Sequence, residues 1–158
     1  MTESDQKLLD HFMNPRNVGE IENPDGFGRT LNPINQYLTD IYLRVKDGCI
    51  DDIKFKTFGC VVTIAAASAL TTGVKGKSLS EIIDNKNSLK ILFKLIEKEL
   101  GVVPEKNWHC PPTAIQALLV AFSNYYHKAH DEKRVKQIDN LLKEVQFFFE
   151  KGIYSSKP

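Results

Sequence analysis

The sequence predicts an α+β fold: a small antiparallel β-sheet packed against helices on one face, with an extra C-terminal helix. Residues 39–45 and 50–58 alternate apolar and polar side chains, as half-buried strands do, and residues 46–48 suit a hairpin turn. Residues 61–74 are apolar or small on nearly every side, which predicts a buried helix. The order of helix, loop, antiparallel strands and further helices indicates the α+β class.

The other elements follow from capping residues and periodicity. A first helix begins after the capping residues 2–5 and ends before Pro15, and His11 within it is interpreted as a surface or packing residue. Loop composition continues to Pro33, with a short extended piece around residues 28–31.

Four helices are predicted beyond the buried one. A capping box of Ser78 and Glu81 starts a short helix, and residues 89–100 form a charged amphipathic helix. Residues 113–129 and 131–151 form the last two helices, the first of them opened by a pair of prolines.

Composition places the chain among ordinary globular proteins. Its 158 residues, 42% of them hydrophobic and 26% charged, suit a single core. The net charge of +1 gives no electrostatic reason to expect a nucleic acid or a membrane as partner, and no apolar run approaches the roughly 20 residues of a membrane span. The polar N-terminus and the odd number of cysteines favour reduced thiols in a cytoplasmic protein.

Two of the three cysteines fall where the chain changes from extended to helical. Cys60 precedes the buried helix, and Cys110 follows His109 at the start of another. The partial positive charge of a helix N-terminus favours thiolate, which is both a nucleophile and a metal ligand. These three residues are therefore a candidate metal or sulfur-handling site. The alternative is that both thiols are inert buried hydrophobes, since their spacing is far from that of a zinc finger.

Three other candidate ligands are interpreted as incidental. Cys49 lies at the hairpin turn, and His127 and His130 lie in a polar stretch without an accompanying carboxylate or thiol.

Four segments together resemble the iron–sulfur cluster assembly scaffolds of the NifU N-terminal or IscU type. They are residues 10–19, 55–60 and 74–79 and the His109-Cys110 pair. The resemblance covers about residues 8–125, and it implies a domain over residues 1–130 with a helical extension over residues 131–158. It further implies a scaffold rather than an enzyme. Such a scaffold holds a 2Fe–2S cluster or zinc, receives sulfur from a cysteine desulfurase and passes the cluster on with an Hsp70-type chaperone.

The resemblance assigns the iron, cluster or zinc ligands to Cys60, His109 and Cys110. Cys110 is the expected sulfur acceptor and the more reactive thiol, because an adjacent imidazolium and a helix N-terminus both favour thiolate. Two features bear on the order of reactivity of the two thiols. Pro111 and Pro112 lack the N–H groups that would stabilise a Cys110 thiolate, which argues against the higher reactivity of Cys110. Burial beside the apolar residues after Cys60 should raise the pKa of Cys60, which argues for it.

Two positions of the family site are replaced in this chain. The family loop reads Pro-x-Cys-Gly-Asp, whereas residues 33–37 place Asn35 at the cysteine position and Tyr37 at the aspartate position. An amide is a poor ligand for iron or zinc, and a phenol is an uncommon one. The family's chaperone-recognition segment, Leu-Pro-Pro-Val-Lys, appears as Val-Val-Pro-Glu-Lys at residues 102–106, which weakens the expectation of a chaperone partner.

Three hypotheses remain open. A scaffold would bind cluster or metal through Cys60, His109 and Cys110, with a fourth ligand from water, a partner chain or Asp40. A sulfur-transfer partner would accept persulfide on Cys110 without a stable cluster. A degenerate relative would bind no cofactor and act as a regulatory docking module.

Overall fold

The structure is a computed structural model that describes residues 1–151, so residues 152–158 of the predicted extension lie outside it. Its sheet has three antiparallel strands in the order β1 (Gly26–Leu31), β2 (Leu38–Lys46) and β3 (Cys49–Thr57). The predicted α+β fold and the β2–β3 hairpin are confirmed, and the short extended piece becomes β1.

The predicted helices are present with small changes at their ends. They are α1 (Glu3–Met13), α2 (Val61–Val74), α3 (Leu79–Ile83), α4 (Ser88–Leu100), α5 (Cys110–Lys128) and α6 (Glu132–Lys151). A 3₁₀ turn, η1 (Glu105–Asn107), lies in the segment before α5. Helix α5 begins at Cys110 rather than after the prolines. The N–H groups of a first helical turn have no acceptor within the helix, so prolines, which lack an N–H group, are tolerated there.

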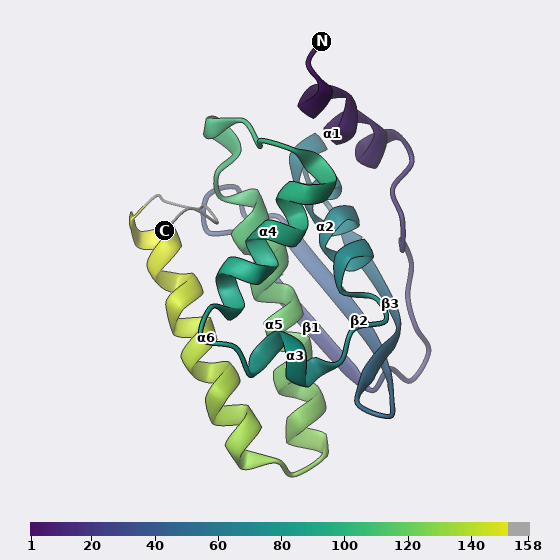
Figure 1. Cartoon of the computed structure of the whole chain (residues 1–158), viewed down its shortest axis with the longest axis vertical. Helices are drawn as coiled ribbons and strands as arrows, with labels where there is room; N and C mark the ends of the chain where they lie inside the picture. The colour runs from purple at the N-terminus through teal and green to yellow at the C-terminus, as the bar shows by residue number, and fades with distance from the viewer. Residues whose placement is uncertain (152–158) are drawn as a thin grey trace.

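The helices cover one face of the sheet and leave the other open (Figure 1). Ile41 and Leu43 of β2 are fully buried in the core, whereas Asp40 and Tyr42 alternate with them toward the open face. Helix α5 lies directly on β1: a side chain at Gly28 would collide with the α5 backbone. This close contact positions the start of α5 relative to the end of the sheet.

The ends of three elements lie at one end of the molecule, toward the top of Figure 1: β3 ends there, and α2 and α5 both begin there. Cys60 and Cys110, 50 positions apart in sequence, are thereby brought to the same end. The fold therefore places the two predicted helix starts side by side.

The N-terminal helix is fastened by a histidine whose partners the sequence did not reveal. His11 is buried, with Nδ1 2.8 Å from Ser68 Oγ of α2 and Nε2 3.1 Å from Glu99 Oε2 of α4. Of its two sequence interpretations, packing is the one observed. Among the described residues, no helix is long and apolar enough to cross a membrane.

Helix α6 shares the core of the preceding helices. Ile138 and Val145 are fully buried, and Arg134 forms an ion pair with Asp84 beyond α3. The aromatic ring of Phe148 meets Phe93 of α4 edge-on at 5.2 Å. The boundary between residues 130 and 131 stays a prediction.

Candidate functional site

Cys60 is the N-cap residue of α2 and is half-buried. Its extended backbone (φ −78°, ψ 174°) is typical of an N-cap residue, and its sulfur lies near the first N–H groups of the helix without forming a capping hydrogen bond. Burial acts to raise the pKa of Cys60, but the contact with the Thr63 hydroxyl, the neighbouring N–H groups of Thr63 and Val62, and the Cys110 thiol together outweigh it, so this pKa lies below its usual value. The thiol of Cys60 is therefore more acidic than that of an ordinary cysteine.

Cys110 occupies the first position of α5 rather than the cap, and its side chain is fully buried. Burial raises the pKa of Cys110 to about 12, although the Thr63 hydroxyl donates to its sulfur at 3.4 Å. These directions reverse the reactivity order expected from sequence: in this conformation Cys60 is favoured as the thiolate.

The two sulfurs lie 3.9 Å apart, and Thr63 Oγ1 is 3.4 Å from each of them. Two thiolates bound at 2.3 Å to one tetrahedral metal ion would have sulfurs roughly 3.8 Å apart. The sulfur pair therefore already has the separation that a shared zinc or iron ion requires.

His109 is buried beside this pair, with Nδ1 3.8 Å from Cys110 Sγ. Its ring meets Trp108 edge-on at 5.6 Å, and Trp108 in turn lies 6.4 Å from Phe149 of α6. Burial lowers the pKa of His109, which leaves the imidazole neutral near pH 7. It therefore does not supply the positive charge that the sequence argument assigned to it.

A residue that the sequence analysis missed holds His109 in place. Asn32 follows β1, is buried, and donates from Nδ2 to His109 Nδ1 at 2.9 Å and to Thr113 Oγ1 at 2.9 Å. The only sequence signal was an asparagine directly before the Pro33 loop.

The loop that carries the replaced ligands has a backbone conformation typical of glycine at one position. Gln36, at the position of the family's glycine, has a left-handed φ of 64°, a conformation that glycine adopts most easily. Asn35 accepts from the Tyr37 N–H at 3.0 Å, and Tyr37 is exposed. The loop therefore supports the alignment that places Asn35 and Tyr37 at two family site positions.

Asp40 does not provide the fourth ligand in this structure. Its carboxylate accepts from Arg29 Nε at 2.7 Å and from Arg29 Nη2 at 2.9 Å, on the open face of the sheet. Within residues 1–151, no group of three or more His, Cys, Asp or Glu side chains is arranged to hold a metal ion. The structure thus brings the two thiols together, while His109 is turned to Asn32.

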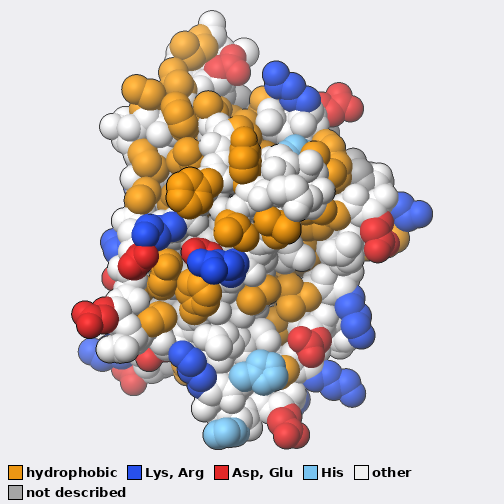
Figure 2. All heavy atoms as spheres, turned by 180° about the vertical axis from the view of Figure 1, so that it is seen from behind, with side chains coloured by type: hydrophobic (Ala, Val, Ile, Leu, Met, Phe, Trp, Pro, Cys, Tyr) orange, Lys and Arg blue, Asp and Glu red, His pale blue; other side chains and the backbone are white. Residues whose placement is uncertain are grey.

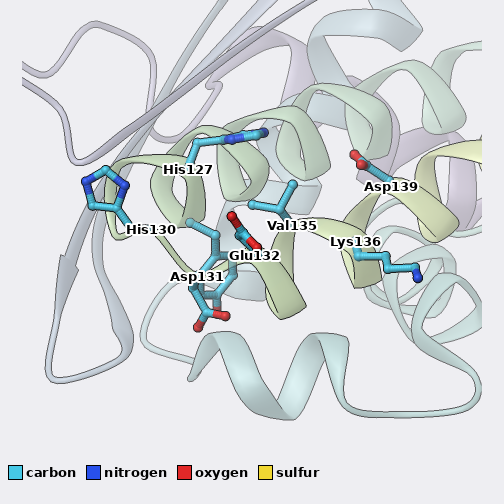
Figure 3. A pocket seen from close by; sticks show the side chains of 8 residues that line it. His127, His130, Asp131, Glu132, Val135, Lys136 and Asp139 are labelled. Atoms are coloured by element: carbon cyan, nitrogen blue, oxygen red, sulfur yellow. The ribbon is translucent and has the colours of Figure 1, made fainter.

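A hollow of about 270 Å³ lies between the end of α5 and the start of α6 (Figure 3). His127 and His130 line it and are both exposed, and the ring of His130 is turned away from that of His127. Their interpretation as surface residues is confirmed.

Exposed hydrophobic side chains surround the thiol end of the molecule. We call this set the rim patch: Leu31, Ile34, Tyr37, Leu38, Phe58 and Val61. Phe58 is 80% exposed although it directly precedes the Gly59-Cys60 turn. Figure 2 shows hydrophobic side chains gathered above the charged side chains at the middle of the open sheet face.

Comparison with known proteins gives a consistent picture. The family described as the NifU-like N terminal domain matches residues 3–132. The chain is similar to the iron–sulfur cluster assembly scaffold protein IscU 1 of Archaeoglobus fulgidus, with 42% identity over 140 residues that cover 89% of this chain and 87% of that protein. It is also similar to the scaffold protein IscU of Aquifex aeolicus, with 36% identity over 146 residues that cover 91% and 89% of the two chains.

A solved structure shares the fold at low sequence identity. It is that of a protein from Fervidobacterium islandicum named for scaffold function in iron–sulfur cluster assembly by the SUF system. The TM-score is 0.58 and the identity 16%, and the match covers 77% of this chain and 95% of that one.

Proposed function

This chain belongs to the NifU-like N-terminal domain family, and from that membership we propose that it is a scaffold on which an iron–sulfur cluster is assembled. The cluster is cargo rather than a resident cofactor, and the protein is not an enzyme in this proposal. Zinc is the alternative occupant of the same thiols. We further propose that the protein works in the cytoplasm.

The observation that carries the proposal is the sulfur pair. Cys60 and Cys110 lie 3.9 Å apart at two helix starts, a separation that suits binding to one iron or zinc ion. His109 is proposed as the third ligand, and water, sulfide or a partner's side chain would complete the coordination. Such an open site suits a protein that must release its cargo.

Sulfur delivery is proposed to use a persulfide of a cysteine desulfurase. A thiolate of this chain attacks the outer persulfide sulfur, a new S–S bond forms, and the old one breaks so that the desulfurase cysteine leaves as thiolate. Cys110 is kept as the proposed acceptor, but its burial means that the α5 start must open first. Without that opening, Cys60 is the competing acceptor.

The rim patch is the proposed docking surface for the desulfurase, because it places exposed apolar area next to the thiols. An Hsp70-type chaperone is proposed to bind only weakly at residues 102–106. Val103 in this segment is buried and η1 begins at Glu105, so little of it is extended and free.

A second candidate function is regulatory docking without a cluster. It is favoured by Asn35 and Tyr37, which replace two family ligands and offer an amide and a phenol instead of a thiolate and a carboxylate. In this case the chain would compete with a complete scaffold for the same desulfurase.

Anaerobic reconstitution with iron and sulfide, followed by an absorption spectrum and a metal count, separates the two. We expect uptake by the natural protein and by Cys49→Ser, a matched control far from the site, and loss of uptake in Cys60→Ser and Cys110→Ser. Absence of uptake in the natural protein would exclude the scaffold and leave either the regulatory function or sulfur transfer without a stable cluster.

The replaced loop provides a gain-of-function test. Asn35→Cys combined with Tyr37→Asp restores a thiolate and a carboxylate at the site, so zinc affinity in a chelator competition should rise at least about tenfold. An unchanged affinity would show that the loop does not face the sulfurs as the alignment places it.

A further inference from the structure

Asn32 uses the whole hydrogen-bonding capacity of its side chain. Oδ1 accepts from the backbone N–H of Ile34 at 2.8 Å and of Asn35 at 3.4 Å, and Nδ2 donates to His109 and Thr113. An amide offers two donors and two acceptor positions, and all four are occupied at a site that is 1% exposed. Such a fully satisfied buried side chain has a single orientation.

That orientation fixes the tautomer of His109. Two backbone N–H groups require an acceptor, so the oxygen of Asn32 faces the loop and its NH₂ faces the imidazole. The Thr113 hydroxyl donates to the His109 carbonyl at 2.7 Å and is therefore free to accept from the same NH₂. His109 Nδ1 is consequently the acceptor, and the ring proton is on Nε2.

Nδ1 is also the nitrogen that lies 3.8 Å from Cys110 Sγ. A metal ion bound to the sulfurs and to this nitrogen needs the lone pair that Asn32 occupies. We propose that Asn32 is a positioning residue that keeps Nδ1 of His109 unprotonated within reach of Cys110, and that competes with the metal ion for this nitrogen.

The same amide couples the ligand to the neighbouring loop. Its oxygen holds the backbone at Ile34 and Asn35, so releasing His109 to a metal ion also loosens the turn that carries Ile34 and Tyr37 of the rim patch. Occupancy of the site would therefore be reported at the docking surface. This coupling rests on the proposed function, whereas the tautomer does not.

The tautomer is tested in the metal-free protein by ¹⁵N NMR of the histidine rings at pH 8, where an imidazole is neutral. We expect the Nε2–H form of His109 in the natural protein and in Asn35→Ala, a control in the same loop without a contact to His109. Asn32→Asp keeps the acceptor for the loop but removes the donor, so the proton should move to Nδ1. An Nδ1–H form in the natural protein would overturn the proposal.

Competition is tested by zinc affinity. Asn32→Ser keeps a side-chain acceptor for the loop but is too short to reach His109. Loss of one competing hydrogen bond should tighten zinc binding about three- to tenfold, and the gain should vanish in a His109→Ala background. No gain, or a gain that persists without His109, would overturn the competition. If no variant binds zinc, the proposed function fails together with the competition, while the NMR result still decides the tautomer.

Discussion

Cys60 and Cys110 both begin a helix, and both lie against Thr63, yet their surroundings differ. Cys60 is the cap of α2, half-buried, and its sulfur meets backbone N–H groups that lower its pKa despite burial. Cys110 is one position further into its helix, fully buried, and burial raises its pKa to about 12. The pKa values of the two thiols of one candidate site thus lie on opposite sides of the pKa of an ordinary cysteine.

The difference shows that a helix start does not by itself activate a thiol. A cap side chain can accept from the N–H groups of the second and third helical residues, whereas a residue at the first helical position points away from them. In α5 the second and third helical residues are Pro111 and Pro112, which have no N–H group. The pKa of Cys110 is therefore set mainly by its burial away from water. Cap position and burial, rather than the helix dipole alone, set the order.

The order is tested most strongly by alkylation with peptide mapping in the metal-free protein. The pKa of Cys60 is lowered whereas that of Cys110 is raised to about 12, so Cys60 carries far more thiolate near pH 8. This excess outweighs the lower nucleophilicity of the more acidic thiolate, and Cys60 should react at least about 30-fold faster. Faster labelling of Cys110 between pH 6 and 8 would show that the α5 start is open in solution and restore Cys110 as the favoured acceptor.

The pH profile of the same reaction distinguishes thiolate content from access. Because only thiolate reacts, the rate at Cys60 should level off once pH passes its pKa, below the ordinary value of 9.0. The rate at Cys110 should still rise about tenfold per pH unit there, since its pKa is about 12. A common midpoint for both thiols would remove the contrast between them.

The fold could be predicted from local patterns, whereas much of the site could not. Alternation fixed the β2–β3 hairpin, and the uniformly apolar stretch fixed α2, because both patterns repeat within a few residues. The meeting of Cys60 with Cys110 came from the family resemblance, since no periodicity links positions 50 apart. The order of their pKa values depends on burial by distant elements and on a one-residue difference in helix register. For the same reason the partners of His11 and the hydrogen bonds of Asn32 appeared only in the structure.

Thr63 should contribute a smaller part of the contrast, because its hydroxyl is one of several groups acting on Cys60. Thr63→Val removes that contact, so the pKa of Cys60 should rise and its labelling at pH 7 should slow about threefold. Thr72→Val is the matched control, because the Thr72 hydroxyl bonds Ser68 O on the same helix. Equal rates in both variants would mean that the backbone donors alone hold the Cys60 thiolate.

The prolines should matter least. Pro112→Ala restores an N–H group to the first turn of α5, but that group is directed toward the cap position, which His109 occupies, rather than toward the sulfur of Cys110. The remaining influence is the weak, screened field of the helix end, so labelling of Cys110 should change less than about twofold. The rate at Cys60 in the same sample serves as the internal control for folding. A large acceleration confined to Cys110 would contradict the assignment of its raised pKa to burial and would assign it to the missing donors instead.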